Sequence, residues 1–308
     1  MRQKTIKKDI SCSGIGLHEG KKVNLTLKPA PENTGIVFWL KKGRERVSLD
    51  LNPYYVSDTL LATTLSKDNK QVATVEHLLG AIQGLEIDNL YIEVEGEELP
   101  IMDGSATSFV FLMRSVGLKK QNAPKKVLGI TKPLKIENGN KKIEARPYKG
   151  LKIHYEIDFP HPLIGRQTYT YINSPERFVT EIAKARTFGF LKDVEMLQQA
   201  GKAKGGSLEN ALVLDEYGLI NTDGLRFKDE FVRHKILDFL GDILLIGMPL
   251  WGEFKVSCSG HAFNNHFVRF LLENKDHYLT EITLSEEKHL TPKRKPVFEA
   301  EPEVVLNM

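Results

Sequence analysis

The chain has little cysteine and no long apolar run. Its two cysteines, Cys12 and Cys258, lie far apart in 308 residues, which argues against a disulfide framework and favours a reducing compartment such as the cytoplasm. No segment approaches the roughly 18 uncharged apolar residues of a membrane helix, and residues 1–14 hold no continuous apolar core of a signal peptide. These absences predict a cytoplasmic protein without stable membrane insertion.

The chain also has little excess charge of either sign. Lys and Arg number 43 against 40 Asp and Glu, and the difference is dispersed rather than gathered in a basic arm. Nucleic-acid binding therefore gains no support. The length is sufficient for two ordinary domains, each with its own core.

What is present is a mixture of strand and helix patterns. β-rich runs at 22–27 and 35–39 are separated by turn residues, and Thr74 precedes apolar residues at helical spacing, where its hydroxyl suits a helix start. A strand at 90–94 and a helix from 105 or 107 to 116 follow. The polar stretch 119–126, which contains a proline, predicts a boundary between domains 1–123 and 124–308.

The second half repeats this plan. We expect strands at 128–136 and 153–159, and helices at 175–186 and 228–245. The sequence thus predicts an α+β fold with two similar halves, although no sequence repeat demonstrates a duplication. The tail, 293–308, mixes charges with proline and is expected to be an irregular strap.

The strongest chemical signal is the pair His234 and Asp238. On a helix these positions share one face, so both side chains can reach one ion, and imidazole with carboxylate suits zinc. Taken alone, the same spacing is more often a surface His–Asp helix pair, because such pairs are common on exposed helices.

Glu76 and His77 supply the missing partners. They resemble half of the H-E-x-x-H arrangement, in which a Glu beside a metal-bound His acts as general base. His77, His234 and Asp238 would give three protein ligands and leave one position for water, which is typical of catalytic zinc. In isolation, Glu76 is equally consistent with an acidic residue favoured at a helix N-terminus.

His261 follows a glycine in the run 257–265. It is a candidate fourth ligand or general acid, and we favour the acid because Asp242, one turn beyond Asp238, can hold a protonated imidazole. A hydrogen-bonded polar histidine without chemistry remains an alternative. The remaining histidines are interpreted as packing or surface residues, His18 being the least certain: His18, His154, His161, His266, His277 and His289.

With these residues assembled, the chain closely resembles the UDP-3-O-acyl-N-acetylglucosamine deacetylases, zinc enzymes of lipid A biosynthesis. The resemblance spans nearly the whole chain, in one order. Its segments are 13–22 (SGIGLHEGKK), 74–78 (TVEHL), 100–105 (PIMDGS), 185–190 (ARTFGF), 223–227 (DGLRF), 231–235 (FVRHK) and 259–261 (SGH).

The resemblance implies two layered domains, each a sheet packed on two helices, with the active site in the cleft between them. It implies zinc on His77, His234 and Asp238, Glu76 as base and His261 as acid, in agreement with the residue-level interpretation. Thr187 would hydrogen-bond the oxyanion of the tetrahedral intermediate. Lys235 would neutralise charge in the cleft, whereas a solvated helix lysine is its simpler interpretation.

The family also carries an insert that forms an apolar passage for the substrate's acyl chain, here expected within 191–206. That segment is amphipathic, as a core-facing helix would also be. Phe188 and Phe190 are candidates for the passage mouth. Three further positions match the nucleotide-sugar end of the family's site: Lys141, Phe159 and Asp193. Cys258 stands where some relatives carry a basic residue, so diphosphate contacts there must differ or weaken.

The expected reaction is hydrolysis of UDP-3-O-acyl-N-acetylglucosamine to UDP-3-O-acyl-glucosamine and acetate by a monomer with one catalytic zinc ion. A zinc amidase acting on another acylated sugar or peptide is the nearest rival. A sugar-nucleotide or lipid-binding protein with structural zinc is a rival of another class. The second rival is disfavoured because structural zinc sites are normally closed by four ligands.

Overall fold

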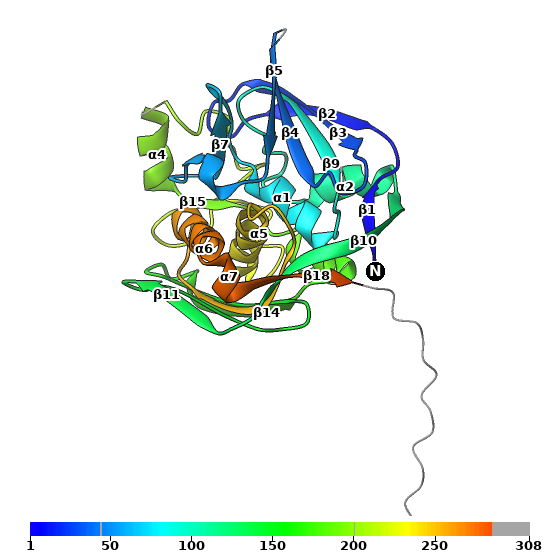
Figure 1. Ribbon diagram of the computed structural model, residues 1–308. Coiled ribbons are helices and arrows are strands. Elements are labelled where there is room, and N and C mark those ends of the chain that lie inside the picture. Colours follow the sequence, from blue (N-terminus) through cyan, green and yellow to red (C-terminus); the bar gives the residue numbers. More distant parts are fainter. Residues whose placement is uncertain (44, 200, 285–308) are drawn as a thin grey trace, which may run out of the picture.

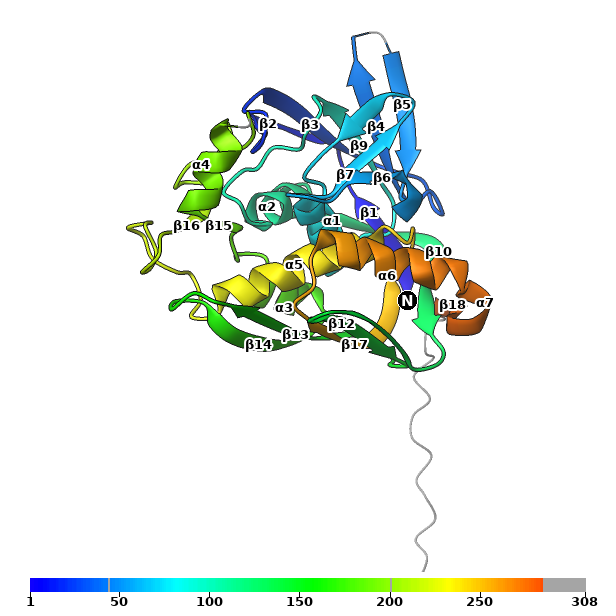
Figure 2. The same cartoon turned by 90° about the vertical axis from the view of Figure 1, so that its left-hand side faces the viewer.

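The computed structural model describes residues 1–43, 45–199 and 201–284. In these residues the fold is mixed α+β, which confirms the predicted class, and the main helices lie between two sheets (Figure 2). No helix among them is long and apolar enough to cross a bilayer. The predicted strap at 293–308 and His289 lie outside the described residues.

Buried and more exposed residues alternate along β3 (Lys22–Pro29), a strand of the first sheet. In this strand, Val23, Leu25 and Leu27 are buried while the residues between them are more exposed, as a half-covered strand requires. The strand order is β2-β3-β9-β4-β5. The other strands are β2 (Ile10–Ile15), β4 (Ile36–Lys42), β5 (Glu45–Asp50) and β9 (Leu90–Glu95).

The second sheet repeats this arrangement. Its order is β11-β12-β17-β13-β14, and in both sheets successive neighbours pair antiparallel, antiparallel, parallel and antiparallel. Its strands are β11 (Leu134–Asn138), β12 (Lys141–Arg146), β13 (Leu151–Phe159), β14 (Gly165–Ile172) and β17 (Leu250–Ser257). The expected strand at 128–136 is interrupted, because residues 131–133 separate two strands.

The predicted boundary at 119–126 falls inside a long strand, β10 (Leu118–Ile130). This strand pairs with β1 (Arg2–Ile6) from the start of the chain, and with β17 and β18 (Leu279–Leu284) from its second half. The polar stretch is therefore an ordered β connection that hydrogen-bonds to both halves.

Two glycines bring the central helices together. α1 (Glu76–Gly84) packs on α5 (Glu230–Leu244), as Figure 1 shows. A Cβ on Gly80 of α1 would lie 2.7 Å from Leu237 Cδ1, and a Cβ on Gly241 of α5 would lie 2.1 Å from the carbonyl oxygen of Glu76. Because neither glycine has a side chain, the two backbones approach closely, and the start of α1, which carries Glu76 and His77, lies against α5.

Each central helix has a second helix beside it: α2 (Thr107–Ser115) contacts α1, and α6 (His261–Glu273) contacts α5. The helices expected at 74, 107 and 228 are confirmed within two residues. The helix expected at 175–186 is wrong in its second half, because α3 (Pro175–Arg177) continues as a π-helical turn, η2 (Phe178–Ile182), and then stops. Ala183 O accepts from Ala106 N, and Thr187 N donates to Gly104 O, so this segment docks on another loop instead.

The predicted insert forms a separate unit at the side of the molecule (Figure 1). Strand β15 (Phe188–Phe190) pairs with β16 (Leu212–Leu214), and α4 (Leu191–Gln199) lies between them in sequence. The remaining elements are η1 (Pro53–Tyr55), β6 (Val56–Asp58), β7 (Thr64–Lys67), β8 (Lys70–Val72) and α7 (Lys275–Tyr278).

Candidate active site

Three side chains of the types that bind zinc converge between α1 and α5. His77 comes from α1, and His234 and Asp238 lie one turn apart on α5; all three are buried and their ligand atoms lie within 4.8 Å of one another. The Nε2 atoms of His77 and His234 are 3.6 and 3.3 Å from Asp238 Oδ1. The structure thus brings together the three residues that the sequence nominated.

The hydrogen bonds around this cluster fit a metal ion. Asp238 Oδ1 is buried and has no hydrogen-bond partner within the described part of the chain, while Oδ2 accepts from Lys235 Nζ at 2.9 Å. His234 Nδ1 lies 3.1 Å from the carbonyl oxygen of Ala185, which can only accept. Nδ1 therefore carries the proton, and Nε2 presents its lone pair towards Asp238 Oδ1, as a metal-ligating histidine does.

Burial and neighbouring charges set the pKa values of His234 and Asp238, and with them the forms that can bind a cation. Desolvation lowers the pKa of His234 to about 3, so the ring is neutral at physiological pH. Burial works against the charged form of Asp238, but the ammonium group of Lys235 donates to its Oδ2 and favours that form, and the pKa of Asp238 lies well below its usual value. A neutral imidazole and an ionised carboxylate are the forms that ligate Zn²⁺.

Glu76 begins α1 immediately before His77 and is 3% exposed. Its Oε2 accepts from the backbone N of Thr63 at 3.0 Å. Burial raises the pKa of Glu76, against the opposing effect of His261 and His77. A carboxylate with a raised pKa is suited to take a proton from water.

His261 and Asp242 form a second functional pair. His261 Nδ1 lies 2.9 Å from Asp242 Oδ2, so Nδ1 donates and Nε2 is left for other contacts. Burial favours the neutral ring, but Asp242 outweighs it and raises the pKa of His261 to about 9. Asp242 also accepts from Thr63 Oγ1 at 2.7 Å and from Asn264 Nδ2 at 2.8 Å. This carboxylate therefore holds His261 protonated and in a fixed orientation.

A cavity of about 600 Å³ is lined partly by the insert and adjoins the pair His234 and Asp238 through its lining residues Phe188 and Lys235. Its lining includes Lys235, Thr187 and the aromatic rings of Phe159, Phe188 and Phe190, as well as apolar residues of α4. The ring centroids of Phe159 and Phe188 are 5.7 Å apart, and those of Phe159 and Phe190 are 6.1 Å apart. The walls have mostly apolar surface, as an acyl-chain passage requires.

The three residues expected at the nucleotide-sugar end lie in two different places. Asp193 lines the 600 Å³ cavity, and Phe159 lines both it and an adjoining cavity of about 400 Å³ that includes His161 and Lys192. Lys141 is exposed at the start of β12, one residue before the pair Lys142–Ser257. It therefore lies at the end of the sheet where the chain leaves β17 and continues through Cys258 to His261.

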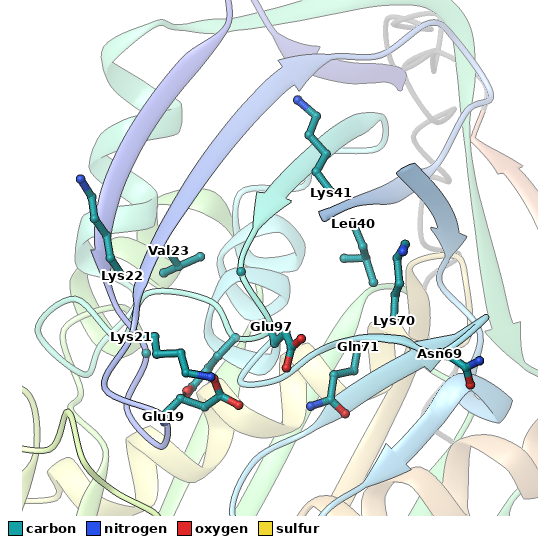
Figure 3. Close-up of a pocket in the computed structure, with 13 residues that line it drawn as sticks. Glu19, Lys21, Lys22, Val23, Leu40, Lys41, Asn69, Lys70, Gln71 and Glu97 are labelled. Carbon is teal, nitrogen blue, oxygen red and sulfur yellow. Dashed lines mark hydrogen bonds and ion pairs between the residues drawn. The ribbon is translucent and has the colours of Figure 1, made fainter. Parts of the chain in front are cut away.

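A third cavity, of about 230 Å³, lies apart from these groups (Figure 3). Charged side chains of the first half surround it, among them Glu19, Lys21, Lys70 and Glu97. None of the nominated site residues lines it, and we assign it no part of the chemistry.

The sequence interpretation missed several residues. Thr63 and Asn264 anchor Asp242, and Thr63 also contacts Glu76; no spacing rule connects residue 63 with 76 and 242. His18 is not a plain packing residue, because it lines the 600 Å³ cavity and neither ring nitrogen has a hydrogen-bond partner in residues 1–284 as described. It lies in the segment 13–22 that carries the family resemblance, which was the available signal.

Comparison with known proteins gives a consistent result. Residues 3–273 match the family model of UDP-3-O-acyl N-acetylglycosamine deacetylase. The UDP-3-O-acyl-N-acetylglucosamine deacetylase of Oleidesulfovibrio alaskensis is 56% identical over 302 residues, 98% of each chain. That of Nitratidesulfovibrio vulgaris is 53% identical, covering 99% of this chain and all of the relative, and that of Histophilus somni is 48% identical, covering 90% and 92%. The chain therefore belongs to the UDP-3-O-acyl-N-acetylglucosamine deacetylase family.

Proposed function

We propose that this chain hydrolyses the acetamide of UDP-3-O-acyl-N-acetylglucosamine to UDP-3-O-acyl-glucosamine and acetate, in the biosynthesis of lipid A. The observation that carries the proposal is the buried cluster of His77, His234 and Asp238, with one unpartnered carboxylate oxygen, beside Glu76. Relatives of about half identity over nearly the full chain carry the name of this activity.

Zinc held by these three residues would supply a Lewis acid that polarises the amide carbonyl and acidifies water. Glu76, buried and with a raised pKa, accepts the proton of the attacking water. Thr187, on the wall of the cavity, donates to the developing oxyanion.

Two cationic side chains, His261 and Lys235, act on the leaving nitrogen and on the charge of the intermediate. His261, held protonated by Asp242, gives its proton to the departing amine. Lys235 lies beside Asp238 and lines the cavity, where its positive charge stabilises negative charge on the intermediate. The two proton-transfer groups thus have opposite resting states, as amide cleavage requires.

The substrate's acyl chain occupies the 600 Å³ cavity, with Phe188 and Phe190 at its mouth. Phe159, Asp193 and Lys141 contact the nucleotide-sugar end. Cys258, at a position often basic in the family, leaves more of the diphosphate charge to Lys141.

We also propose a division into domains 1–123 and 124–308, with the site in the cleft between them, and a cytoplasmic monomer as the working form. The matching strand orders of the two sheets support the division, and α1 and α5 contribute their ligands from opposite sides.

The direct test is acetate release from the acylated substrate and from its counterpart without the acyl chain, each with and without a zinc chelator. We expect chelator-sensitive release that strongly favours the acylated substrate. Equal release from both would indicate a zinc amidase without an acyl passage. No release, with tight binding of the sugar nucleotide, would indicate a binding protein.

A further inference from the structure

Thr74 is strained at a position next to the catalytic groups. Its φ is +59°, in the left-handed region that β-branched residues rarely adopt, and it lies two residues before Glu76. Thr74 is buried, and its Oγ1 donates to Glu98 Oε1 at 2.9 Å. Strain of this kind persists only where surrounding contacts enforce it, and Glu98 is such a contact.

The same carboxylate binds a loop from the start of the chain. Glu98 accepts from the backbone N of His18, at 3.0 and 3.1 Å to its two oxygens, and from the backbone N of Glu19 at 3.1 Å. A Cβ on Gly16 would lie 2.4 Å from Glu98 Oε2, so the loop closes tightly on this carboxylate. Glu98 thus joins the loop 16–20 to the strained residue that precedes Glu76 and His77.

This loop separates two cavities. Leu17 and His18 line the 600 Å³ passage, whereas Gly16 and Glu19 line the 230 Å³ cavity, where Figure 3 shows Glu19. The carbonyl oxygens of Leu17 and His18 also accept from the backbone of the insert, at Gly205 and Lys204. A chain that fills the passage therefore contacts this loop at Leu17 and His18.

We propose that Glu98 is a positioning residue that couples occupancy of the acyl passage to the placement of Glu76 and His77. Contact of the acyl chain with Leu17 and His18 fixes the position of the loop. The loop in turn fixes the position of the Glu98 carboxylate through its backbone N–H groups. The carboxylate then holds Thr74 and, through it, the first turn of α1. The acyl chain then contributes to turnover as well as to binding. This inference rests on the proposed function.

The test is Glu98→Gln, with Glu19→Gln as a matched control. A glutamine has nearly the same shape, but it has no negative charge and its NH₂ group cannot accept a hydrogen bond, so the contacts with His18 N, Glu19 N and Thr74 Oγ1 are weakened. Glu19 is in the same loop, and its carboxylate forms an exposed ion pair with Lys21. We measure kcat, KM and zinc content with the acylated substrate and with its acyl-free counterpart.

In Glu98→Gln we expect the preference for the acylated substrate to fall about tenfold, through kcat rather than KM, with zinc retained. Glu19→Gln should keep the wild-type preference. An equal loss on both substrates would mean a purely structural role and overturn the proposal, as would an unchanged preference. A wild-type chain that hydrolyses neither substrate would instead refute the proposed function.

If Glu98→Gln does not fold, Thr74→Val and Thr74→Ser decide the matter. Valine keeps the branched shape and removes the hydroxyl that reaches Glu98, whereas serine retains it. The coupling predicts a reduced acyl preference in Thr74→Val and a preference near wild type in Thr74→Ser. Equal preferences in the two variants would overturn it.

Discussion

At the scale of single residues, burial gives ordinary side chains their chemistry. Glu76, His234, Asp238 and Asp242 are each at most 3% exposed, and each has a specific partner at the site. Because water cannot satisfy these groups, one protonation state is favoured for each of them.

Removal of the base separates chemistry from metal binding. In Glu76→Ala, turnover should fall by roughly 10² to 10⁴-fold, the usual contribution of a general base, because the other carboxylate beside His77, that of Asp238, is a proposed metal ligand and cannot take over the proton. Zinc content should remain near that of the wild type, since Glu76 is not a ligand. Metal analysis and acetate release on the same preparation check both parts; a normal rate would remove Glu76 from the base role.

The His261–Asp242 pair predicts a pH dependence. His261 acts as an acid only while protonated, and Asp242 raises its pKa from 6.5 to about 9, so activity should decline as pH rises through about 9. The pair's contribution to stability is likewise complete below pH 6.5 and is lost as pH rises through about 9. In Asp242→Asn, the alkaline decline should move down by about one to three pH units. A pH–rate profile with the same alkaline limb in both proteins would contradict the assignment.

The sequence predicted the residues with strong local signals. His234 and Asp238 share a helix face, and Glu76 adjoins His77 in a recognisable motif. Thr63 and Glu98 could not be predicted, because their importance comes from contacts with residues distant in sequence.

At the scale of elements, the site depends on how closely α1 and α5 approach. Gly80 and Gly241 permit that approach, and the ligands come from both helices. Periodicity predicted both helices because their apolar residues recur at helical spacing. It failed at 183–186, because tertiary hydrogen bonds to Gly104 and Ala106 override the local helical preference there.

Separation of these helices should weaken the metal site. In Gly241→Ala, the new methyl group would collide with the carbonyl oxygen of Glu76, 2.1 Å away, so the free energy of unfolding should fall by about 1–3 kcal/mol. Zinc retention during dialysis should fall with it. Gly218→Ala is the control, since a Cβ there has no atom within 4 Å among the described residues and requires no positive φ. Equal stability and zinc retention in the two variants would contradict this account.

At the scale of the whole molecule, two sheets with the same strand order enclose the helices that carry the site. The sequence indicated two similar halves from the succession of strands and helices. It did not reveal the matching order, because strand pairing such as β4 with β9 and β13 with β17 joins segments far apart in the chain. It also did not reveal that β10 links both halves.

Hydrolysis is proposed to depend on one ion held by His77, His234 and Asp238. The most direct measurement is acetate release from zinc-free protein during titration with Zn²⁺, alongside Asp238→Ala. We predict that activity rises linearly to about one ion per chain, and that Asp238→Ala neither retains zinc nor gains comparable activity. Full activity of the zinc-free protein, or full zinc occupancy with normal turnover in Asp238→Ala, would contradict the claim.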